Sequence, residues 1–307
     1  MIQVKNLTKS FDELIAVNTV NLNIKKGEIF GLLGPNGAGK STLINLLSSL
    51  LKCDSGEVFL NGIDLNQDAT SCKRIIGIVP QEISLYDEFS AYDNLLFFGK
   101  LFNIDSKILK TRIEEILTLI GLENRKNDLV KTYSGGMKRR INIAAALLHQ
   151  PKILLMDEPT VGVDPQSRNR IFEIVEKLNQ QGLTIVYTTH YMEEVERLCN
   201  RIAIMDNGKI IAQGTLKELQ QQSNTQEKLL VTFKQITKNQ VAEISQLLNA
   251  KIKQTDTNLE ITCNINNDLK KLISYCSQQK LTLTNIKLNK ANLEAIFLEL
   301  TNKSLRD

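Results

Sequence analysis

Short apolar runs alternate with longer amphipathic segments through the first two-thirds of the chain. The runs are apolar almost throughout, which is typical of strands that are covered on both faces of a sheet. The segments between them carry apolar residues at helical spacing. This alternation predicts an α/β fold with a mostly parallel sheet. We expect strands over residues 29–33, 75–79, 153–156 and 184–188, and helices over residues 40–50, 106–120, 135–149, 165–180 and 191–199.

Two Asn-Gly pairs predict hairpin turns. Asn61-Gly62 and Asn207-Gly208 each lie between apolar runs, and this dipeptide favours tight turns between antiparallel strands. We therefore expect an antiparallel subsheet beside the parallel sheet.

A polar stretch over residues 220–228, rich in Gln, Ser, Asn and Thr, predicts a linker between two domains. Residues 1–219 would then form the main domain. Over residues 229–307 the pattern restarts as a strand, a helix, two strands, a helix, a strand and a last helix. This order fits a small α+β domain of ferredoxin-like topology. It carries no catalytic motif, so we expect it to pack, dimerise or regulate.

Composition and charge are those of an ordinary folded protein. Of the 307 residues, 42% are hydrophobic and 23% are charged, and the net charge of +4 comes from interspersed residues. This balance does not demand a nucleic-acid partner, and we expect none. The five cysteines are widely spread without a C-x-x-C pair, which argues against a disulfide framework and a zinc site. The first residues lack the apolar run of a signal peptide, and no apolar stretch is long enough to span a bilayer. A role at a membrane would therefore need a second chain.

Residues 34–42 read G-P-N-G-A-G-K-S-T and lie between a predicted buried strand and a predicted helix. The glycines let the backbone curl so that successive N–H groups point at phosphate oxygens, and the helix adds its positive end. Lys40 supplies an ammonium group for the β- and γ-phosphates, and the Ser41 hydroxyl suits Mg²⁺. A glycine-rich turn that happens to precede a lysine would not explain the strand–loop–helix order. We therefore predict an ATP site formed by Gly34, Pro35, Asn36, Gly37, Ala38, Gly39, Lys40, Ser41 and Thr42.

Asp157 and Glu158 directly follow the apolar run 153–156. The end of a strand in an open parallel sheet faces the ligand crevice, so both carboxylates should emerge near the phosphates. Asp157 suits Mg²⁺, and Glu158 suits the task of orienting the attacking water or accepting its proton. Alone, an acidic pair after a strand is more often a helix cap or a solvent-facing feature. Beside a phosphate loop, the pair predicts hydrolysis.

The next apolar run ends in His190, at the equivalent edge of the predicted sheet. A neutral imidazole there would sense the γ-phosphate or hold the attacking water, although a lone histidine at a strand end is usually structural. Gln81 follows the run 75–79 and Pro80, and by itself is only a turn glutamine. His149, in the last turn of a predicted helix, is assigned no function.

Ser134, Gly135 and Gly136 precede a long predicted helix. A serine N-cap followed by glycines leaves free N–H groups at the positive end of a helix. The simpler interpretation is only a well-capped helix. However, a chain with a complete phosphate loop needs no second phosphate grip for the same ATP. We therefore expect this element to bind the nucleotide of a partner chain, in a two-fold dimer that closes over two ATP molecules.

These motifs, in this order, resemble those of the ATP-binding subunit of an ABC transporter over about residues 2–219. Residues 34–42 match the Walker A motif and residues 153–158 the Walker B motif. Residues 133–137, YSGGM, stand where the family signature usually reads LSGGQ, and residues 161–164, VGVD, stand at the D-loop. The Ser-Gly-Gly centre and the aspartate match, whereas their flanking residues differ from the commonest ones.

The resemblance also implies roles that the pattern of the chain leaves open. It implies that Gln81 is the Q-loop glutamine, which contacts Mg²⁺ and couples to the membrane subunit. It implies that His190 is the switch histidine and that Phe11 stacks on adenine. Asp164 would join the nucleotide-binding residues through the D-loop. With Pro165 after it, Asp164 also suits a helix N-cap, and both roles are compatible.

The segments YSGGMKRR, VGVDPQSR and NLEAIFLEL are together similar to the drug, lipid or polysaccharide exporter branch of this family. The resemblance implies ATP and Mg²⁺ as cofactors, an integral membrane permease subunit as partner, and a second nucleotide-binding domain from an identical or related chain. It implies a place at the cytoplasmic face of a membrane. A helical subdomain over about residues 82–150 would contact the permease. Its apolar cluster, at residues 95–98 with Leu101 and Phe102, fits either a partner groove or the core of an amphipathic helix.

A soluble ABC-type ATPase that acts on ribosomes or DNA is the alternative function. Translation factors of that kind look like two such domains in tandem, whereas this chain has one phosphate loop. DNA-repair relatives carry a long coiled coil or zinc-binding cysteines between the two Walker motifs, and neither appears here. A non-catalytic nucleotide sensor would not need Glu158. The sequence therefore favours an ATP-hydrolysing subunit that energises transport, in the direction of export.

Overall fold

The computed structural model describes residues 1–222, 228–262, 265–289 and 293–301. These residues divide into two compact units, one over residues 1–216 and one that begins at residue 217. Among the described residues, no helix combines the length and the apolar character needed to cross a bilayer. Each unit is described below by itself.

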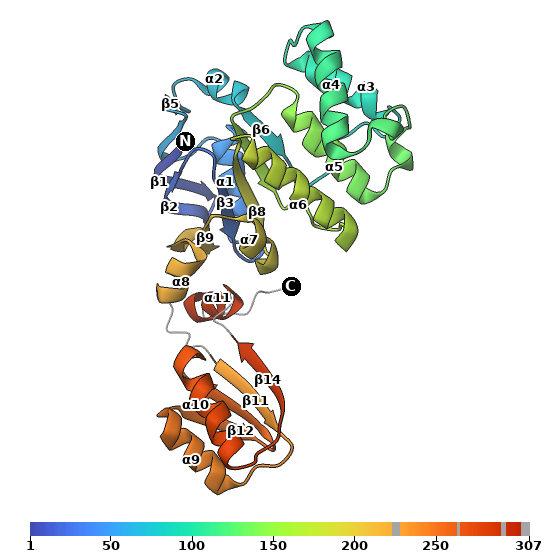
Figure 1. The fold of residues 1–307 in the computed structure, drawn as a ribbon. Coiled ribbons are helices and arrows are strands. Elements are labelled where there is room, and N and C mark those ends of the chain that lie inside the picture. The colour runs from blue at the N-terminus through green and yellow to red at the C-terminus, as the bar shows by residue number, and fades with distance from the viewer. Residues whose placement is uncertain (223–227, 263–264, 290–292, 302–307) are drawn as a thin grey trace. The chain divides into compact units, whose positions relative to one another are not determined.

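A six-stranded sheet forms the centre of the N-terminal unit (Figure 1). Its first five strands in space are parallel, and the strand at one edge pairs antiparallel with its neighbour. The predicted parallel sheet is confirmed, with strand ends within one residue of expectation. In spatial order the strands are β6 (Ile76–Val79), β7 (Ile153–Asp157), β8 (Thr184–Thr189), β3 (Ile29–Leu33), β9 (Arg201–Asp206) and β10 (Lys209–Gly214).

The predicted antiparallel subsheet is also present, and it has four strands. Both Asn-Gly pairs form hairpin turns, between β4 and β5 and between β9 and β10. Asn61 and Gly62 both have positive φ, at 53° and 84°, as the tight primed turns require. The strands are, in spatial order, β2 (Leu14–Ile24), β1 (Ile2–Phe11), β4 (Ser55–Leu60) and β5 (Ile63–Asp64), and the short helix α2 (Ala69–Arg74) follows β5.

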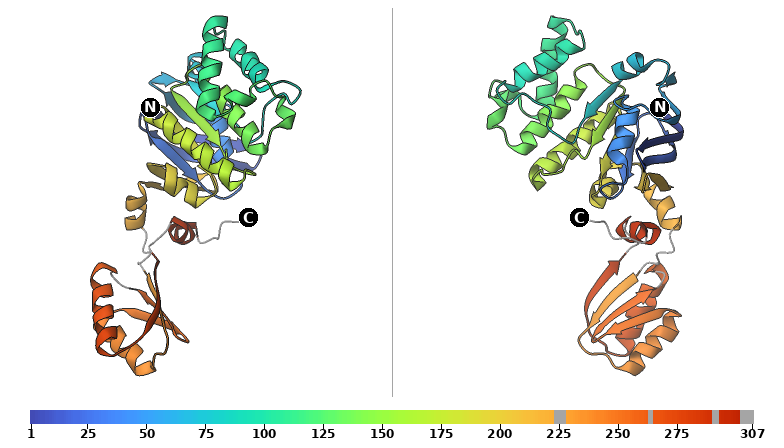
Figure 2. Two further views of the ribbon diagram at one scale, coloured as in Figure 1. Left: turned by 45° about the vertical axis from the view of Figure 1, so that its right-hand side comes forward. Right: turned by 180° about the vertical axis from the view of Figure 1, so that it is seen from behind.

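Helices cover both faces of the parallel sheet (Figure 2), and α3, α4 and α5 pack on one another. Alternate residues of β7 face two different hydrophobic clusters. Leu154 and Met156 pack with the helices α3 to α6, whereas Ile153 and Leu155 pack with α1 and the antiparallel sheet. The helices are α1 (Lys40–Leu47), α3 (Ala91–Leu101), α4 (Ser106–Ile120), α5 (Gly135–Leu147), α6 (Pro165–Gln180) and α7 (Met192–Leu198), with single 3₁₀ turns at Glu123–Arg125 and Val130–Thr132.

Two helices end earlier than the sequence predicts. The helix expected over residues 40–50 ends at Leu47, because Ser49 adopts a left-handed φ of 59°. The helix expected over residues 135–149 ends at Leu147, and Gln150 has a φ of 53° before Pro151. In both cases the apolar periodicity continues past the last helical residue, so the pattern alone overestimates the length.

The C-terminal unit has the predicted strand–helix–strand–strand–helix–strand order. Its four strands are antiparallel in the spatial order β12-β13-β11-β14, which is the ferredoxin-like arrangement. Residues 220–222, expected in the linker, end helix α8 (Leu216–Gln222), and residues 223–227 lie outside the described residues. The other elements are β11 (Lys228–Phe233), α9 (Lys238–Leu248), β12 (Lys251–Thr255), β13 (Asn258–Thr262), α10 (Ile265–Gln278), β14 (Leu283–Asn289) and α11 (Leu293–Thr301).

Candidate functional site

The loop between β3 and α1 has the close packing that its glycines permit. A Cβ atom on Gly34 would lie 2.3 Å from the carbonyl oxygen of Met205, and one on Gly39 would lie 2.2 Å from that of Ala16. Gly39 also has a φ of 103°, which side chains rarely adopt. The loop is therefore pressed against neighbouring strands, with α1 beginning at Lys40.

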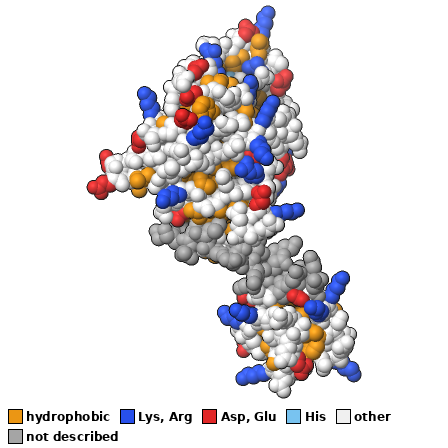
Figure 3. All heavy atoms as spheres, turned by 90° about the vertical axis from the view of Figure 1, so that its left-hand side faces the viewer, with side chains coloured by type: hydrophobic (Ala, Val, Ile, Leu, Met, Phe, Trp, Pro, Cys, Tyr) orange, Lys and Arg blue, Asp and Glu red, His pale blue; other side chains and the backbone are white. Residues whose placement is uncertain are grey.

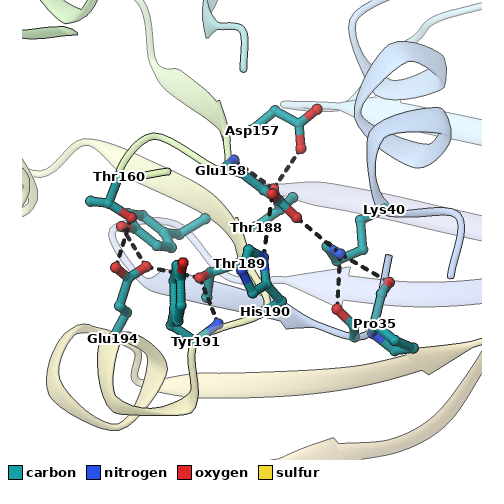
Figure 4. A network of polar contacts seen from close by, with 12 residues as sticks. Pro35, Lys40, Asp157, Glu158, Thr160, Thr188, Thr189, His190, Tyr191 and Glu194 are labelled. Atoms are coloured by element: carbon teal, nitrogen blue, oxygen red, sulfur yellow. Dashed lines mark hydrogen bonds and ion pairs between the residues drawn. The ribbon is translucent and has the colours of Figure 1, made fainter. Parts of the chain in front are cut away.

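Lys40 lies at one edge of the polar network in Figure 4. Its Nζ donates to the carbonyl oxygens of Gly34, at 2.8 Å, and Pro35, at 3.1 Å. Glu158 Oε1 lies 3.1 Å from the same nitrogen. Only 4% of Lys40 is exposed, so this ammonium group is buried with three oxygen partners. A buried charge needs such partners, because they replace the water that burial removes.

Asp157 and Glu158 emerge from the end of β7 as the sequence predicts. Thr188, on the neighbouring strand β8, donates its hydroxyl to Asp157 Oδ1 at 2.6 Å and accepts from the Glu158 N–H at 3.0 Å. Glu158 has a left-handed φ of 44°. That conformation costs a non-glycine residue about 1–3 kcal/mol, and it is held here by the bonds to Thr188.

His190 follows β8 and approaches the carboxylate oxygen of Glu158 that does not contact Lys40. Its Nδ1 lies 3.4 Å from Glu158 Oε2, and its ring packs on Tyr191 with centroids 4.1 Å apart. Glu158, which is only 5% exposed, therefore lies between a cation and an imidazole (Figure 4). Three residues that are far apart in sequence meet at the carboxyl ends of three adjacent parallel strands.

The remaining residues of the predicted nucleotide site differ in solvent exposure. Ser41 is exposed in the first turn of α1, and Asn36 and Gly37 are exposed in the loop. Phe11, at the end of β1, is 41% exposed, with the Lys9 ammonium 5.5 Å from the centre of its ring.

Gln81 lies apart from the network. Its carbonyl oxygen accepts from Arg139 Nη2 at 2.6 Å, and its side chain is exposed. Among the described residues, no hydrogen bond joins that side chain to Lys40, Asp157 or Glu158. The magnesium role of Gln81 therefore stays a prediction.

The predicted second phosphate-binding element, residues 134–136, packs against the predicted D-loop and the start of α6 in the same chain. Ser134 caps α5 by accepting from the Met137 N–H at 3.3 Å. A Cβ atom on Gly136 would lie 2.3 Å from the side chain of Ser167, in the first turn of α6. Asp164 caps α6 through the Ser167 N–H, and this bond lowers the pKa of Asp164. Ser134, Gly135 and Asp164 are all exposed, as residues that bind a second chain need to be.

Sequence analysis missed two residues of the network, Thr188 and Glu194. Thr188 lies in the apolar run of β8, where a threonine is usually a strand residue without further meaning. Glu194 is one of several glutamates in α7, and its sequence gives no sign that it is buried while Glu193 is exposed. Only the packing of α7 on β8 separates the two.

Comparison with known proteins agrees with this geometry. The family profile described as ABC transporter matches residues 17–161. The linearmycin resistance ATP-binding protein of Bacillus subtilis (strain 168) is 42% identical over 311 aligned positions that cover all of both chains. The daunorubicin/doxorubicin resistance ATP-binding protein of Streptomyces peucetius is 33% identical, over all of this chain and 94% of that protein.

Solved structures show the same fold. The dimeric structure of a post-hydrolysis state of an ATP-binding cassette, bound to ADP and Pi, superimposes with a TM-score of 0.63 at 32% identity. The superimposed region covers 70% of this chain and 99% of the solved chain. These likenesses support a subunit that energises transport and not the soluble ATPase alternative. The chain therefore belongs to the ABC transporter family, as an ATP-binding and ATP-hydrolysing subunit.

Proposed function

We propose that this subunit hydrolyses Mg²⁺-ATP at the Lys40–Glu158–His190 network. The observation that carries the proposal is the place of Glu158, between a buried cation and an imidazole. Lys40 would hold the β- and γ-phosphate oxygens, and Glu158 would accept the proton of the attacking water. His190 would hold the γ-phosphate end of this arrangement.

The residues present fit a magnesium ion. Ser41 offers an exposed hydroxyl and Asp157 a carboxylate, and hard oxygen ligands of this kind are what Mg²⁺ prefers. Thr188 occupies only Oδ1 of Asp157 among the described contacts. The ion would neutralise charge on the phosphate oxygens, with Gln81 as a further oxygen ligand.

A second copy or a related chain would complete the nucleotide site. Ser134, Gly135, Gly136 and Asp164 stand at helix starts, where all but the buried Gly136 are exposed, and no described contact joins them to the Lys40 network of their own chain. A two-fold dimer would place them over the phosphates that the partner's loop holds.

A membrane-spanning partner would bind at an apolar groove in the N-terminal unit. The groove has a volume of about 380 Å³ and lies between the sheet and the helices α3 and α5. Its walls include Leu50, Ile78, Phe98, Phe102 and His149. Next to Phe98, the rings of Tyr86, Phe89 and Phe97 form an aromatic cluster, and Tyr86 and Phe89 are exposed.

An amphipathic helix of a membrane subunit is the occupant that this groove fits. The groove is lined by residues of the sheet and of the helical subdomain. A helix bound there would contact both parts, so a movement of one part relative to the other would change its contacts. Relatives that are named for drug resistance and for Nod factor export support export as the direction of transport. We propose that the protein works at the cytoplasmic face of a membrane, bound through that partner, and the names of these relatives support this.

The test captures the partner with an ATP-trapped variant. Tagged Glu158→Gln protein, loaded with ATP, is recovered from detergent-solubilised native membranes, alone and with either Phe102→Asp or Ile211→Asp added. Both apolar residues are exposed, but only Phe102 lines the groove. We expect a polytopic membrane protein in equal amount, lost with Phe102→Asp and kept with Ile211→Asp. Recovery of ribosomes or nucleic acid without a membrane protein would overturn the proposal.

A further inference from the structure

Glu194 is a buried carboxylate that the hydrolysis chemistry described above does not use. It lies in the first turn of α7, and only 1% of it is exposed, whereas the neighbouring Glu193 is exposed. Burying an ionised carboxylate costs free energy unless hydrogen bonds and an opposite charge replace water. The contacts of Glu194 show where that compensation comes from.

Three hydroxyl groups donate to Glu194, and they come from two different segments. Thr160 Oγ1 donates to Oε1 at 2.7 Å. Tyr187 OH and Thr189 Oγ1, both on β8, donate to Oε2 at 3.1 Å and 2.8 Å. All three donors are buried (Figure 4). Burial, and then the charge of Glu194, hold the pKa of the Tyr187 phenol well above its usual value, so it stays protonated and donates.

A fourth contact joins Glu194 to the beginning of α6. Arg168 Nε lies 3.7 Å from Glu194 Oε1, and the guanidinium group stacks over the ring of Tyr191 at 5.2 Å. Both carboxylate oxygens are therefore engaged, one towards the segment after Glu158 and one towards the segment before His190.

These two segments carry Glu158 and His190, whose relative positions matter for the proposed hydrolysis. Thr160 lies two positions after Glu158 and four before Asp164, and Thr189 directly precedes His190. Because one carboxylate holds both hydroxyls, the distance between the Glu158 loop and the His190 strand end depends on Glu194. We infer that Glu194 is a positioning residue for ATP hydrolysis, which ties the segment 158–164 to the strand end that carries His190. This inference rests on the proposed roles of Glu158 and His190.

A simpler interpretation is that Glu194 only fastens α7 to β8. The bond from Thr160 distinguishes the two interpretations, because it joins α7 to the segment after Glu158 and adds nothing to the contact between α7 and β8. Thr160→Val removes this bond with little change in side-chain shape, and it leaves the bonds from Tyr187 and Thr189 in place. Thr160→Ser restores the hydroxyl. Loss of alignment by a fraction of an ångström lowers turnover with little effect on ATP affinity.

The experiment measures kcat and KM for ATP together with unfolding in urea. For Thr160→Val we expect kcat to fall about tenfold with KM changed less than about twofold, and for Thr160→Ser we expect recovery. Thr184→Val is the matched control. Thr184 is equally buried and accepts from the Gly27 N–H at 2.9 Å at the other end of β8, so its loss should lower stability and leave kcat unchanged.

Glu194→Gln, in turn, should match the loss of Thr160→Val, and the double variant should add little to it. Wild-type kcat in Thr160→Val, with Glu158→Gln inactive, would overturn this inference alone. A wild-type protein that fails to hydrolyse ATP would overturn the proposed function together with it. If Glu194→Gln does not fold, the Thr160 pair decides.

Discussion

Lys40 Nζ lies 3.1 Å from Glu158 Oε1, and both side chains are almost fully buried. The group proposed to hold the phosphates is thus held by the group proposed to activate water. Phosphate oxygens that bind Lys40 would add to three oxygen partners that already occupy its ammonium group. We therefore expect the nucleotide to compete with Glu158 for Lys40.

The first prediction follows from that competition. Glu158→Gln removes the anionic partner of Lys40 while it keeps the side-chain shape. We expect the dissociation constant of a non-hydrolysable ATP analogue to fall about tenfold, which corresponds to one charge-assisted hydrogen bond of about 1.5 kcal/mol. Calorimetric titration of the analogue measures it. Weaker binding by the variant would show that Glu158 assists the nucleotide and does not compete with it.

The adjacent glycines of the second phosphate-binding element should differ in tolerance. In Gly136→Ala the new Cβ would meet the Ser167 side chain at 2.3 Å, whereas in Gly135→Ala the nearest atom outside helix α5, the Gly162 carbonyl oxygen, is 4.0 Å away. We expect Gly136→Ala to lower the free energy of unfolding by about 1–3 kcal/mol and Gly135→Ala to change it by less than about 0.5 kcal/mol. Urea unfolding compares the two. Equal effects would contradict the packing between α5 and α6.

His149 should make the stability of the protein depend on pH. Its Nε2 lies 2.8 Å from the Ile76 carbonyl oxygen, and its ring stacks on Phe102 with centroids 3.9 Å apart. Burial lowers the pKa of His149 below its usual value of 6.5. Between the two pKa values the unfolded chain binds a proton that the folded chain does not, so the free energy of unfolding falls as pH drops below about 6.5.

The variant His149→Gln keeps a hydrogen-bond donor and removes the titration. We expect the wild type to lose more stability than this variant between about pH 7.5 and about pH 5.5. The other histidine, His190, is present in both proteins and cancels in the difference. Urea unfolding at each pH measures the effect. Parallel pH profiles would show that His149 is not held neutral in the folded state.

A mixing experiment tests whether two chains share each nucleotide site. Ser134→Arg disables the signature element, and Lys40→Ala disables the phosphate loop, so either variant alone should lack ATPase activity. A mixed dimer contains one intact site, with Lys40 from one chain and Ser134 from the other. Because half of the dimers in an equal mixture are mixed, we expect about one quarter of wild-type activity. No recovery on mixing, or full activity of Ser134→Arg alone, would contradict a shared site.

Local patterns were enough to predict the fold and two parts of the candidate site, the phosphate loop and the polar residues that follow the strands β7 and β8. The phosphate loop is a contiguous motif, and Asp157, Glu158 and His190 follow apolar runs whose parallel pairing brings their ends together. The ferredoxin-like order of the second unit also followed from element succession. Charges on the face in Figure 3 are interspersed, in line with the low net charge.

Contacts between distant segments could not be predicted. The left-handed φ of Glu158 depends on Thr188, which lies 30 residues away in sequence. The burial of Glu194 depends on donors from β8 and from Thr160. Helix α1 ends before its apolar pattern does, because Ser49 turns left-handed. The roles of Phe11 and Gln81 stay predictions, since no described hydrogen bond or ring contact joins either side chain to Lys40, Glu158 or His190.

ATP turnover at saturating nucleotide, by the wild type and by Glu158→Gln, tests the central claim most directly. Both proteins are measured at the same ATP occupancy, which is checked by retention of labelled nucleotide. We predict that Glu158→Gln retains ATP and turns it over at least about 100-fold more slowly, the scale of losing a general base. Wild-type turnover in a variant that is fully loaded with ATP would contradict the assignment of Glu158 as the group that activates water.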